Sequence, residues 1–149
     1  MRLSVYLTAA VLAFITATVG SDVIASIFIT GRTLREALAE HMHWATAEPT
    51  GTLWLLAPFV GLALLCGAFD KGMRRRSALA IFGGASLGLI LLYFHAYQSA
   101  EQFAHDRMWT AATLTVAFVP LKSVLVLLVA LAAIGVATMF DPATPPSSA

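Results

Sequence analysis

Residues 77–97, SALAIFGGASLGLILLYFHAY, form an apolar run without a single Asp, Glu, Lys or Arg. About 20 such residues are enough to cross the hydrocarbon core of a membrane. Backbone groups in lipid must be satisfied within the segment, which favours a helix. The whole chain of 149 residues is similar, since 59% of it is hydrophobic and only 11% is charged. Soluble domains contain roughly 25% charged residues, so the sequence predicts an integral membrane protein.

Three further apolar runs accompany this one. We therefore expect an all-α bundle of four transmembrane helices in one membrane domain, residues 1–140, with spans over about 3–29, 52–69, 77–97 and 110–140. The first run begins like a signal peptide, with small residues near 20–21, but it stays apolar to residue 29, which favours an uncleaved anchor. Residues 141–149 are rich in Pro and Ser and are predicted to be a disordered tail.

Basic residues gather in one short loop, where Asp70 is accompanied by four cations, Lys71, Arg74, Arg75 and Arg76. The positive-inside rule places this loop and both termini on the cytoplasmic side. The four cations are predicted to set the topology and to contact anionic lipids. We expect a multi-pass protein of the bacterial inner membrane. The net charge of +1 gives no indication of nucleic-acid binding.

The first outward loop contains a helical pattern. Leu34, Leu38 and Met42 recur every four residues, and Thr33 followed by Glu36 matches a capping box. This pattern predicts a short amphipathic helix over about residues 34–44, lying at the membrane interface or over the open end of the bundle.

Asp22 and Lys122 are ionisable residues inside apolar runs. Counting about 20 residues from the cytoplasmic end of each helix places both at the outer edge of the hydrocarbon. They are predicted to form an intramembrane ion pair, unless Lys122 extends to the outer headgroups instead. A third interpretation is an ion or proton route, although no polar residues continue it inward.

Prolines and aromatic residues lie near the same level. Pro58 predicts a bend in the second span, and Pro120 frees a carbonyl near Val116 that a donor on a neighbouring helix could take. Three aromatic residues are expected to form an interfacial belt: Trp54, Tyr93 and Tyr97.

All four histidines fall on the outward side, at positions 41, 43, 95 and 105. Together with a carboxylate they could bind zinc or copper, and the candidate ligands are His41, His43, His95, Glu101 and His105. Side chains two apart on a helix point in different directions, and no metal-binding motif is present. Interfacial or hydrogen-bonding histidines without a resident cofactor are the competing interpretation.

Small residues in the third span predict a helix-packing face, formed by Gly83, Gly84 and Gly88. The single cysteine, Cys66, excludes a disulfide within one chain and is expected to be a buried packing residue. The midplane has no histidine for haem, and no nucleophile motif frames a catalytic site. The chain is therefore not expected to be an enzyme.

The sequence predicts a small accessory or structural subunit that associates with a larger integral-membrane complex of the transport or respiratory type. Its expected partners are membrane lipids and either another integral membrane protein or a second copy of the chain. Two alternatives remain open: an outward-facing, histidine-based metal- or redox-linked protein, and an oligomeric small transporter or channel.

Overall fold

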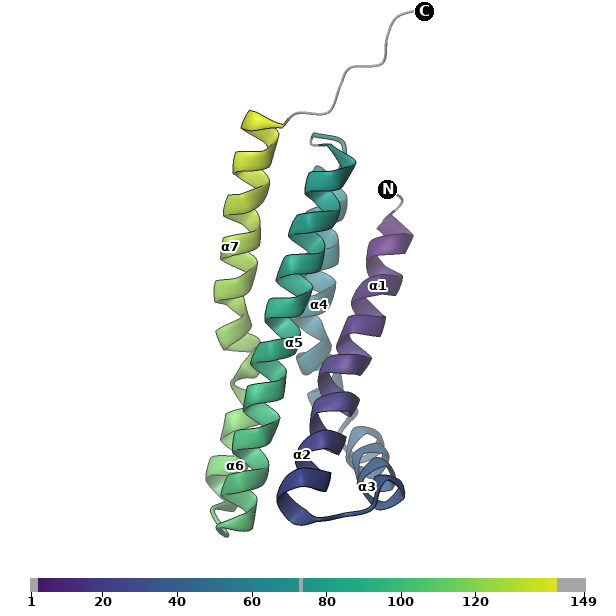
Figure 1. The fold of residues 1–149 in the computed structure, drawn as a ribbon, viewed down its shortest axis with the longest axis vertical. Coiled ribbons are helices and arrows are strands. Elements are labelled where there is room, and N and C mark those ends of the chain that lie inside the picture. Colours follow the sequence, from purple (N-terminus) through teal and green to yellow (C-terminus); the bar gives the residue numbers. More distant parts are fainter. Residues whose placement is uncertain (1–2, 73, 142–149) are drawn as a thin grey trace, which may run out of the picture.

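A computed structural model describes residues 3–72 and 74–141 of the chain, and the expected tail lies outside this range except for Asp141. The described residues form helices and contain no strand, which confirms the predicted all-α fold (Figure 1). The elements in chain order are α1 (Leu3–Ile15), the π-helical turn η1 (Thr16–Gly20), α2 (Ser21–Thr30), α3 (Leu34–Ala47), α4 (Pro49–Phe69), α5 (Arg75–His105), α6 (Trp109–Ala117) and α7 (Val119–Phe140).

Four helices are long and apolar enough to cross a membrane, as predicted. They cover Leu3–Thr30, Pro49–Phe69, Arg75–His105 and Trp109–Phe140. At about 1.5 Å per residue, α4 is roughly 32 Å long and matches a hydrocarbon core of about 30 Å. The other three contain 28, 31 and 32 residues, so they are roughly 12–18 Å longer than the core.

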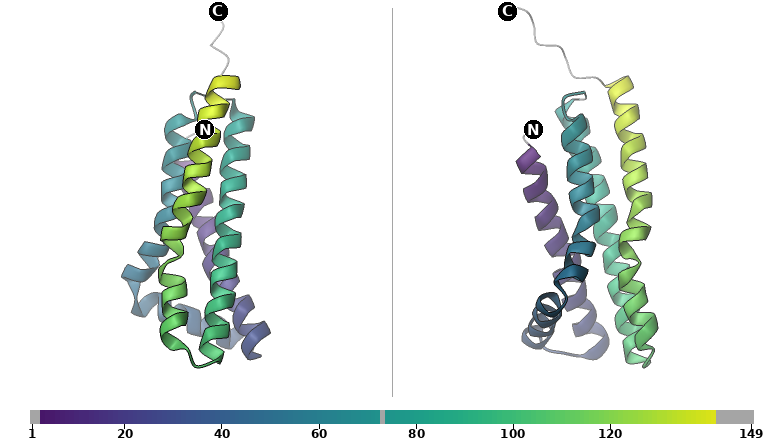
Figure 2. Two further views of the ribbon diagram at one scale, coloured as in Figure 1. Left: turned by 90° about the vertical axis from the view of Figure 1, so that its left-hand side faces the viewer. Right: turned by 180° about the vertical axis from the view of Figure 1, so that it is seen from behind.

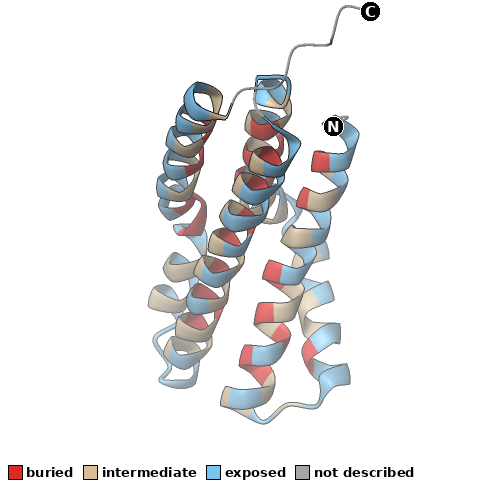
Figure 3. Ribbon diagram, turned by 45° about the horizontal axis from the view of Figure 1, so that its top comes forward, coloured by how far each residue is buried: buried red, intermediate tan, exposed pale blue. Residues whose placement is uncertain are grey.

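Helix α5 lies at the centre of the bundle. It packs against α1, η1, α2, α4, α6 and α7, while α1 packs mainly on α4 (Figures 1 and 2). Helix α7 lies on the opposite side of α5 from α1 and α2. The buried side chains line the inner faces of these helices (Figure 3). Because every other spanning helix touches α5, its long course positions most of the candidate site.

The core is built from aromatic and aliphatic side chains. Tyr6 and Phe82 meet edge to face with ring centroids 5.2 Å apart, and Phe59 and Tyr93 do so at the same distance. Such contacts favour one packing arrangement because the ring quadrupoles are directional. Cys66 is buried among these helices, as expected from the sequence.

At one end of the bundle, α1 and α5 begin and α4 and α7 end. We call it the arginine end, because its α4–α5 turn carries the cluster Lys71, Arg74, Arg75 and Arg76. The Tyr6 hydroxyl donates to Asp70 at 2.7 Å, which joins α1 to the end of α4. Asp141 accepts from Arg74 Nε at 2.9 Å and from the Ser77 hydroxyl at 2.5 Å, which joins α7 to α5. These contacts align the helix ends, so the extra length of α2, α5 and α6 extends to the other end, which we call the α3 end.

The two prolines interrupt the helix hydrogen bonds at neighbouring places. Helices α6 and α7 are separated at Phe118, just before Pro120. The Trp54 indole donates to the Ala117 carbonyl at 3.1 Å, so a donor from a neighbouring helix serves this break, one residue beyond the expected acceptor. In α4, the Leu55 carbonyl lies one turn before Pro58 and accepts from the Tyr93 hydroxyl at 2.5 Å.

These contacts correct part of the predicted aromatic belt. Trp54 is half exposed, but Tyr93 and Tyr97 are buried inside the bundle. The Tyr93 hydroxyl donates to the Leu55 carbonyl, next to Trp54, whose carbonyl is the one that Pro58 leaves without its helical donor. Hydropathy counting gives the depth of a residue but not the direction in which its side chain points.

Helix α3 runs from Leu34 to Ala47, about one turn beyond the expected end. Its capping box is present as predicted: the Thr33 side chain accepts from the Glu36 N–H, and the Glu36 side chain accepts from the Thr33 N–H. These hydrogen bonds, first from the Thr33 backbone and then from its side chain, hold the pKa of the Glu36 carboxyl below its ordinary value. The apolar side chains of Leu34, Leu38 and Met42 stay exposed, so the bundle itself does not cover the apolar stripe of α3.

Candidate functional site

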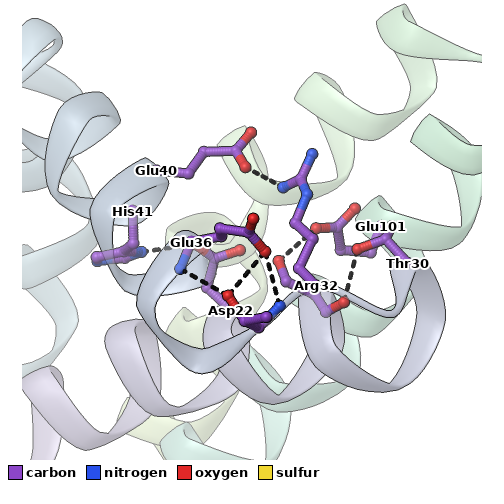
Figure 4. A network of polar contacts seen from close by, with 9 residues as sticks. Asp22, Thr30, Arg32, Glu36, Glu40, His41 and Glu101 are labelled. Atoms are coloured by element: carbon purple, nitrogen blue, oxygen red, sulfur yellow. Dashed lines mark hydrogen bonds and ion pairs between the residues drawn. The ribbon is translucent and has the colours of Figure 1, made fainter.

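Asp22 follows the π-helical turn η1 directly. Such a turn inserts one extra residue, which rotates all later side chains by about 100° around the helix axis. The Asp22 carboxylate then lies 2.6 Å from Nδ1 of His41 on α3 (Figure 4). An ionised carboxylate can only accept, so the imidazole donates through Nδ1. The two side chains are only 23% and 12% exposed, and their contact fastens α3 to α2.

This contact corrects the predicted ion pair between Asp22 and Lys122. Lys122 is exposed on α7, and no ion pair within residues 3–72 and 74–141 includes it. Helix α7 packs mainly against α4 and α5, whereas α2 packs against α5 and α3. Asp22 and Lys122 are predicted to lie at the same depth because of their distances from the helix ends. They do not meet, because α5 lies between α2 and α7. Extension of Lys122 toward the headgroups remains the other prediction.

A second polar contact joins α2 to α5. The Ser26 hydroxyl donates to the Glu101 carboxylate at 2.6 Å, and the Thr30 hydroxyl donates to the Ser26 carbonyl at 2.6 Å (Figure 4). Arg32 forms an ion pair with Glu40 next to these contacts. The α3 end therefore holds a chain of polar contacts between α5, α2 and α3, which the sequence pattern did not reveal.

The predicted metal ligands do not converge. His41 is held by Asp22, Glu101 accepts from Ser26, and His43 is exposed on α3. His95 and His105 lie on the same helix, but ten residues separate them by about 15 Å along its axis. Among the described residues no three His, Cys, Asp or Glu side chains are grouped as a metal ion requires. The candidate ligands lie toward the α3 end of the bundle, but their side chains do not meet at one place.

An open pocket of about 390 Å³, which we call the polar groove, runs along the outer half of α5. It is lined by His95, Gln98, Ser99, Gln102, His105 and Asp106, with Ile29 of α2 on one wall. Their spacing of three and four residues puts the α5 side chains on one helix face. This spacing is visible in the sequence, but glutamine and serine side chains carry no charge and match no metal-binding motif, so the sequence pattern did not single them out.

A second pocket, which we call the apolar groove, lies nearer the arginine end between α5 and α7. Its volume is about 470 Å³, and its lining is Ala80, Ile81, Gly84, Ala85, Gly88, Leu125, Val126, Val129, Ala130 and Ala133. Two of the predicted packing glycines, Gly84 and Gly88, belong to it, whereas Gly83 is exposed beside it.

The glycines of the spanning helices differ in what surrounds them. A Cβ atom at Gly67 would lie 2.6 Å from Leu3 Cδ1, and one at Gly88 would lie 3.5 Å from Val126 Cγ1. A Cβ atom at Gly83 or Gly84 would meet nothing within 4 Å. The close approach to Leu3 therefore accounts for Gly67, a Cβ atom at Gly88 would make an ordinary contact with Val126, and the packing does not account for Gly83 and Gly84.

The four cations of the arginine cluster are exposed. Arg74 also pairs with Asp141, and this pair is half open to solvent, so screening limits its strength. The exposed side chains are free to reach lipid headgroups, and the predicted roles of the cluster in topology and lipid contact stay predictions.

In chemical terms, the close polar contacts of the α3 end hold helices together, while the two grooves stay open. The close contacts satisfy carboxylates and hydroxyls within the bundle, and the polar groove presents amide, imidazole, hydroxyl and carboxylate groups that could bind a polar molecule. No family model, curated protein or solved structure matches this chain.

Proposed function

We propose that the protein is a small accessory subunit of a larger integral-membrane complex, of the transport or respiratory type, and that a transmembrane helix of its partner binds in the apolar groove. The arginine end faces the cytoplasm of a bacterial cell in this proposal, because four cations flank the α4–α5 turn and cytoplasmic loops are rich in Lys and Arg.

The observation that carries the proposal is the unexplained space above Gly84. Glycine inside a helix is less favourable than alanine by roughly 0.8–1 kcal/mol. Within residues 3–72 and 74–141, nothing requires glycine at this position, since a Cβ atom would have no neighbour there within 4 Å. Small residues let a second helix backbone approach closely, which is how helices associate in a membrane.

The surroundings of Gly84 fit a helix better than an acyl chain. Ala80, Gly84 and Gly88 follow one another at intervals of four on the floor of the groove. Lipid tails are as apolar as leucine, so a surface that meets only lipid gains nothing from small side chains. Leu125 and Val129 are each 69% exposed at the rim, where they could pack against the sides of an incoming helix.

The proposal can be tested by native mass spectrometry of the protein extracted in mild detergent from its own membrane. We expect a second, larger chain at fixed stoichiometry with the wild type, and its loss with Gly84→Leu. The leucine side chain would fill the groove while the fold remains intact, because there is open space around Gly84.

Ala57→Leu is the matched control, because it adds a large side chain at an exposed position of α4. This variant should keep the partner. If Gly84→Leu and Ala57→Leu retained the partner equally, the apolar groove would not be the docking site. A homodimer that Gly84→Leu dissociates would show that the occupant is a second copy and would overturn the accessory role.

A further inference from the structure

The polar groove lies at the level of the lipid headgroups. If the hydrocarbon begins just after Arg76, about 20 residues of α5 bring it to an end near Tyr97. The headgroup layer adds roughly 5–8 Å on each side of the core, which corresponds to about three to five further residues. His95 therefore lies at the edge of the hydrocarbon, Gln98 to Gln102 lie in the headgroup layer, and Asp106, nine residues beyond Tyr97, lies roughly 6–8 Å above that layer.

The groups along the groove follow an order. The His95 imidazole lies lowest, two amides and a hydroxyl follow, and the His105 imidazole and the Asp106 carboxylate lie together at the top. Imidazole, amide and hydroxyl groups all donate hydrogen bonds while carrying no obligatory charge, and a carboxylate only accepts. A phospholipid standing in a membrane presents its polar groups in the matching order: ester carbonyls, then phosphate, then the terminal group of the headgroup.

Asp106 determines which terminal group fits. Within the part of the chain that the structure describes, no ion pair or side-chain hydrogen bond holds its carboxylate. Neither Lys nor Arg lines the groove. The Asp106 carboxylate therefore attracts a cation to the top of the groove, and it disfavours a lipid of net negative charge because no Lys or Arg side chain lines the groove.

We propose that the polar groove binds one zwitterionic phospholipid with a primary ammonium group, a phosphatidylethanolamine. His95 donates to an ester carbonyl, Gln98, Ser99 and Gln102 donate to the phosphate, and Asp106 accepts from the ammonium. The acyl chains descend past Leu91, which lies one turn below His95 on the same helix face and is exposed. This site is separate from the apolar groove and does not depend on the accessory role.

Two properties separate this lipid from its relatives. A choline headgroup carries a quaternary ammonium that cannot donate a hydrogen bond, and a glycerol headgroup carries no cation at all. With the wild type in nanodiscs of equal parts phosphatidylethanolamine, phosphatidylcholine and phosphatidylglycerol with identical chains, we expect native mass spectrometry to find the first lipid retained about three- to tenfold over each of the others.

The variants should change this preference in different ways. Asp106→Asn should bring the ratio of phosphatidylethanolamine to phosphatidylcholine close to one and should raise the share of phosphatidylglycerol. The double variant Gln98→Ala, Gln102→Ala should lower retention of all three lipids by a similar factor, because all three carry the phosphate. Glu48→Gln and His43→Gln remove exposed groups outside the groove and should change neither ratio.

Each contrary result would overturn the proposal. Equal retention of the three lipids by the wild type would mean unselective annular contact. An unchanged lipid ratio in Asp106→Asn would remove the assigned role of the carboxylate, and so would an equal shift in Glu48→Gln. If soluble phosphoethanolamine displaced the lipid at comparable concentration, the ligand would be a soluble compound and not a membrane lipid. Thermal unfolding of every variant checks that the fold is retained.

Discussion

The two ends of the bundle use carboxylates in different ways. At the arginine end, Asp70 and Asp141 stand at the ends of helices and accept from Tyr6, Ser77 and Arg74 on neighbouring helices. At the α3 end, Asp22 and Glu101 stand within helices, where they bind α3 and α2. The contacts at the arginine end hold the ends of neighbouring helices at one level. The contacts at the α3 end join helices that extend beyond the hydrocarbon, and they leave the polar groove open beside them.

The difference indicates where the chain has freedom to bind other molecules. Direct hydrogen bonds align the helix ends at the arginine end, so a ligand there would meet mainly the exposed cations. At the α3 end, the extra length of α5 carries polar side chains that the packing within the chain does not use.

The contact between Asp22 and His41 should contribute most. His41→Ala leaves a partly buried carboxylate without its donor, and we expect the free energy of unfolding to fall by about 1–2 kcal/mol. Asp22→Asn should give a similar loss, and the double variant should lose much less than the sum. Unfolding in mixed micelles of increasing SDS content measures each value.

The same cycle applied to Asp22 and Lys122 provides the contrast. Since α5 separates their helices, the effects of Asp22→Asn and Lys122→Met should add to within about 0.5 kcal/mol. Strong coupling in this second cycle, or additivity in the first, would mean that the polar contacts of the α3 end are assigned to the wrong partners.

At the arginine end, Tyr6→Phe should lower the free energy of unfolding by about 1 kcal/mol. The variant removes the hydroxyl that donates to Asp70 but retains the buried ring and its edge-to-face contact with Phe82. Tyr93→Phe is the matched variant halfway along the bundle, since it removes the donor to Leu55 in the same way. If neither variant lost stability, hydrogen bonding between helices would not be what holds this bundle together.

Two glycines refine the comparison. Gly84→Ala should stabilise the isolated chain by about 0.5–1 kcal/mol, because it reduces the freedom of the unfolded chain and its Cβ atom meets nothing. Gly67 lies near the arginine end, where a Cβ atom would come within 2.6 Å of Leu3. Gly67→Ala should therefore show no such gain. Thermal unfolding of the two variants side by side would measure this difference, and an equal gain in both would contradict the close approach at Gly67.

The smallest effect concerns the start of α3. The pKa of the Glu36 carboxyl is lowered in the folded chain, so its stabilisation of the capping box is complete above the ordinary glutamate pKa of about 4.3 and is lost as the pH falls through the lowered value. Amide hydrogen exchange in the first turn of α3, corrected for the intrinsic rate, should accelerate over that range. Glu36→Gln should abolish the pH dependence, while a wild type without any dependence would contradict the assignment.

Composition and periodicity were enough to predict the four spans, the helix after Thr33 and the burial of Cys66, because each depends on local chemistry or on length. The partners of individual side chains were not predictable in the same way. The turn η1 rotates Asp22 toward α3, and no sequence pattern indicated the extra residue. Similarly, nothing in the sequence indicated that Tyr93 points into the bundle, where its hydroxyl donates to the Leu55 carbonyl of α4.

Helix α5 extends beyond the predicted third span, which covered residues 77–97, because the helix continues to His105. Hydropathy decreases after Tyr97 because the next two turns carry polar side chains. A helix that leaves the hydrocarbon still forms its backbone hydrogen bonds, so a fall in hydropathy does not mark the end of the helix. Most of the polar groove lies along this continuation.

The central place of α5 has a consequence for how the protein is made. A ribosome delivers α1 and α4 first, and these two helices pack directly on each other and can wait in the bilayer as a hairpin joined through α3. Helix α5 arrives third and finds contact surfaces on both, and α7 completes the bundle last against α4 and α5. Synthesis thus begins with the pair α1 and α4, then adds the central helix α5 and finally α7. Every spanning helix after the first therefore inserts beside a helix that it packs against.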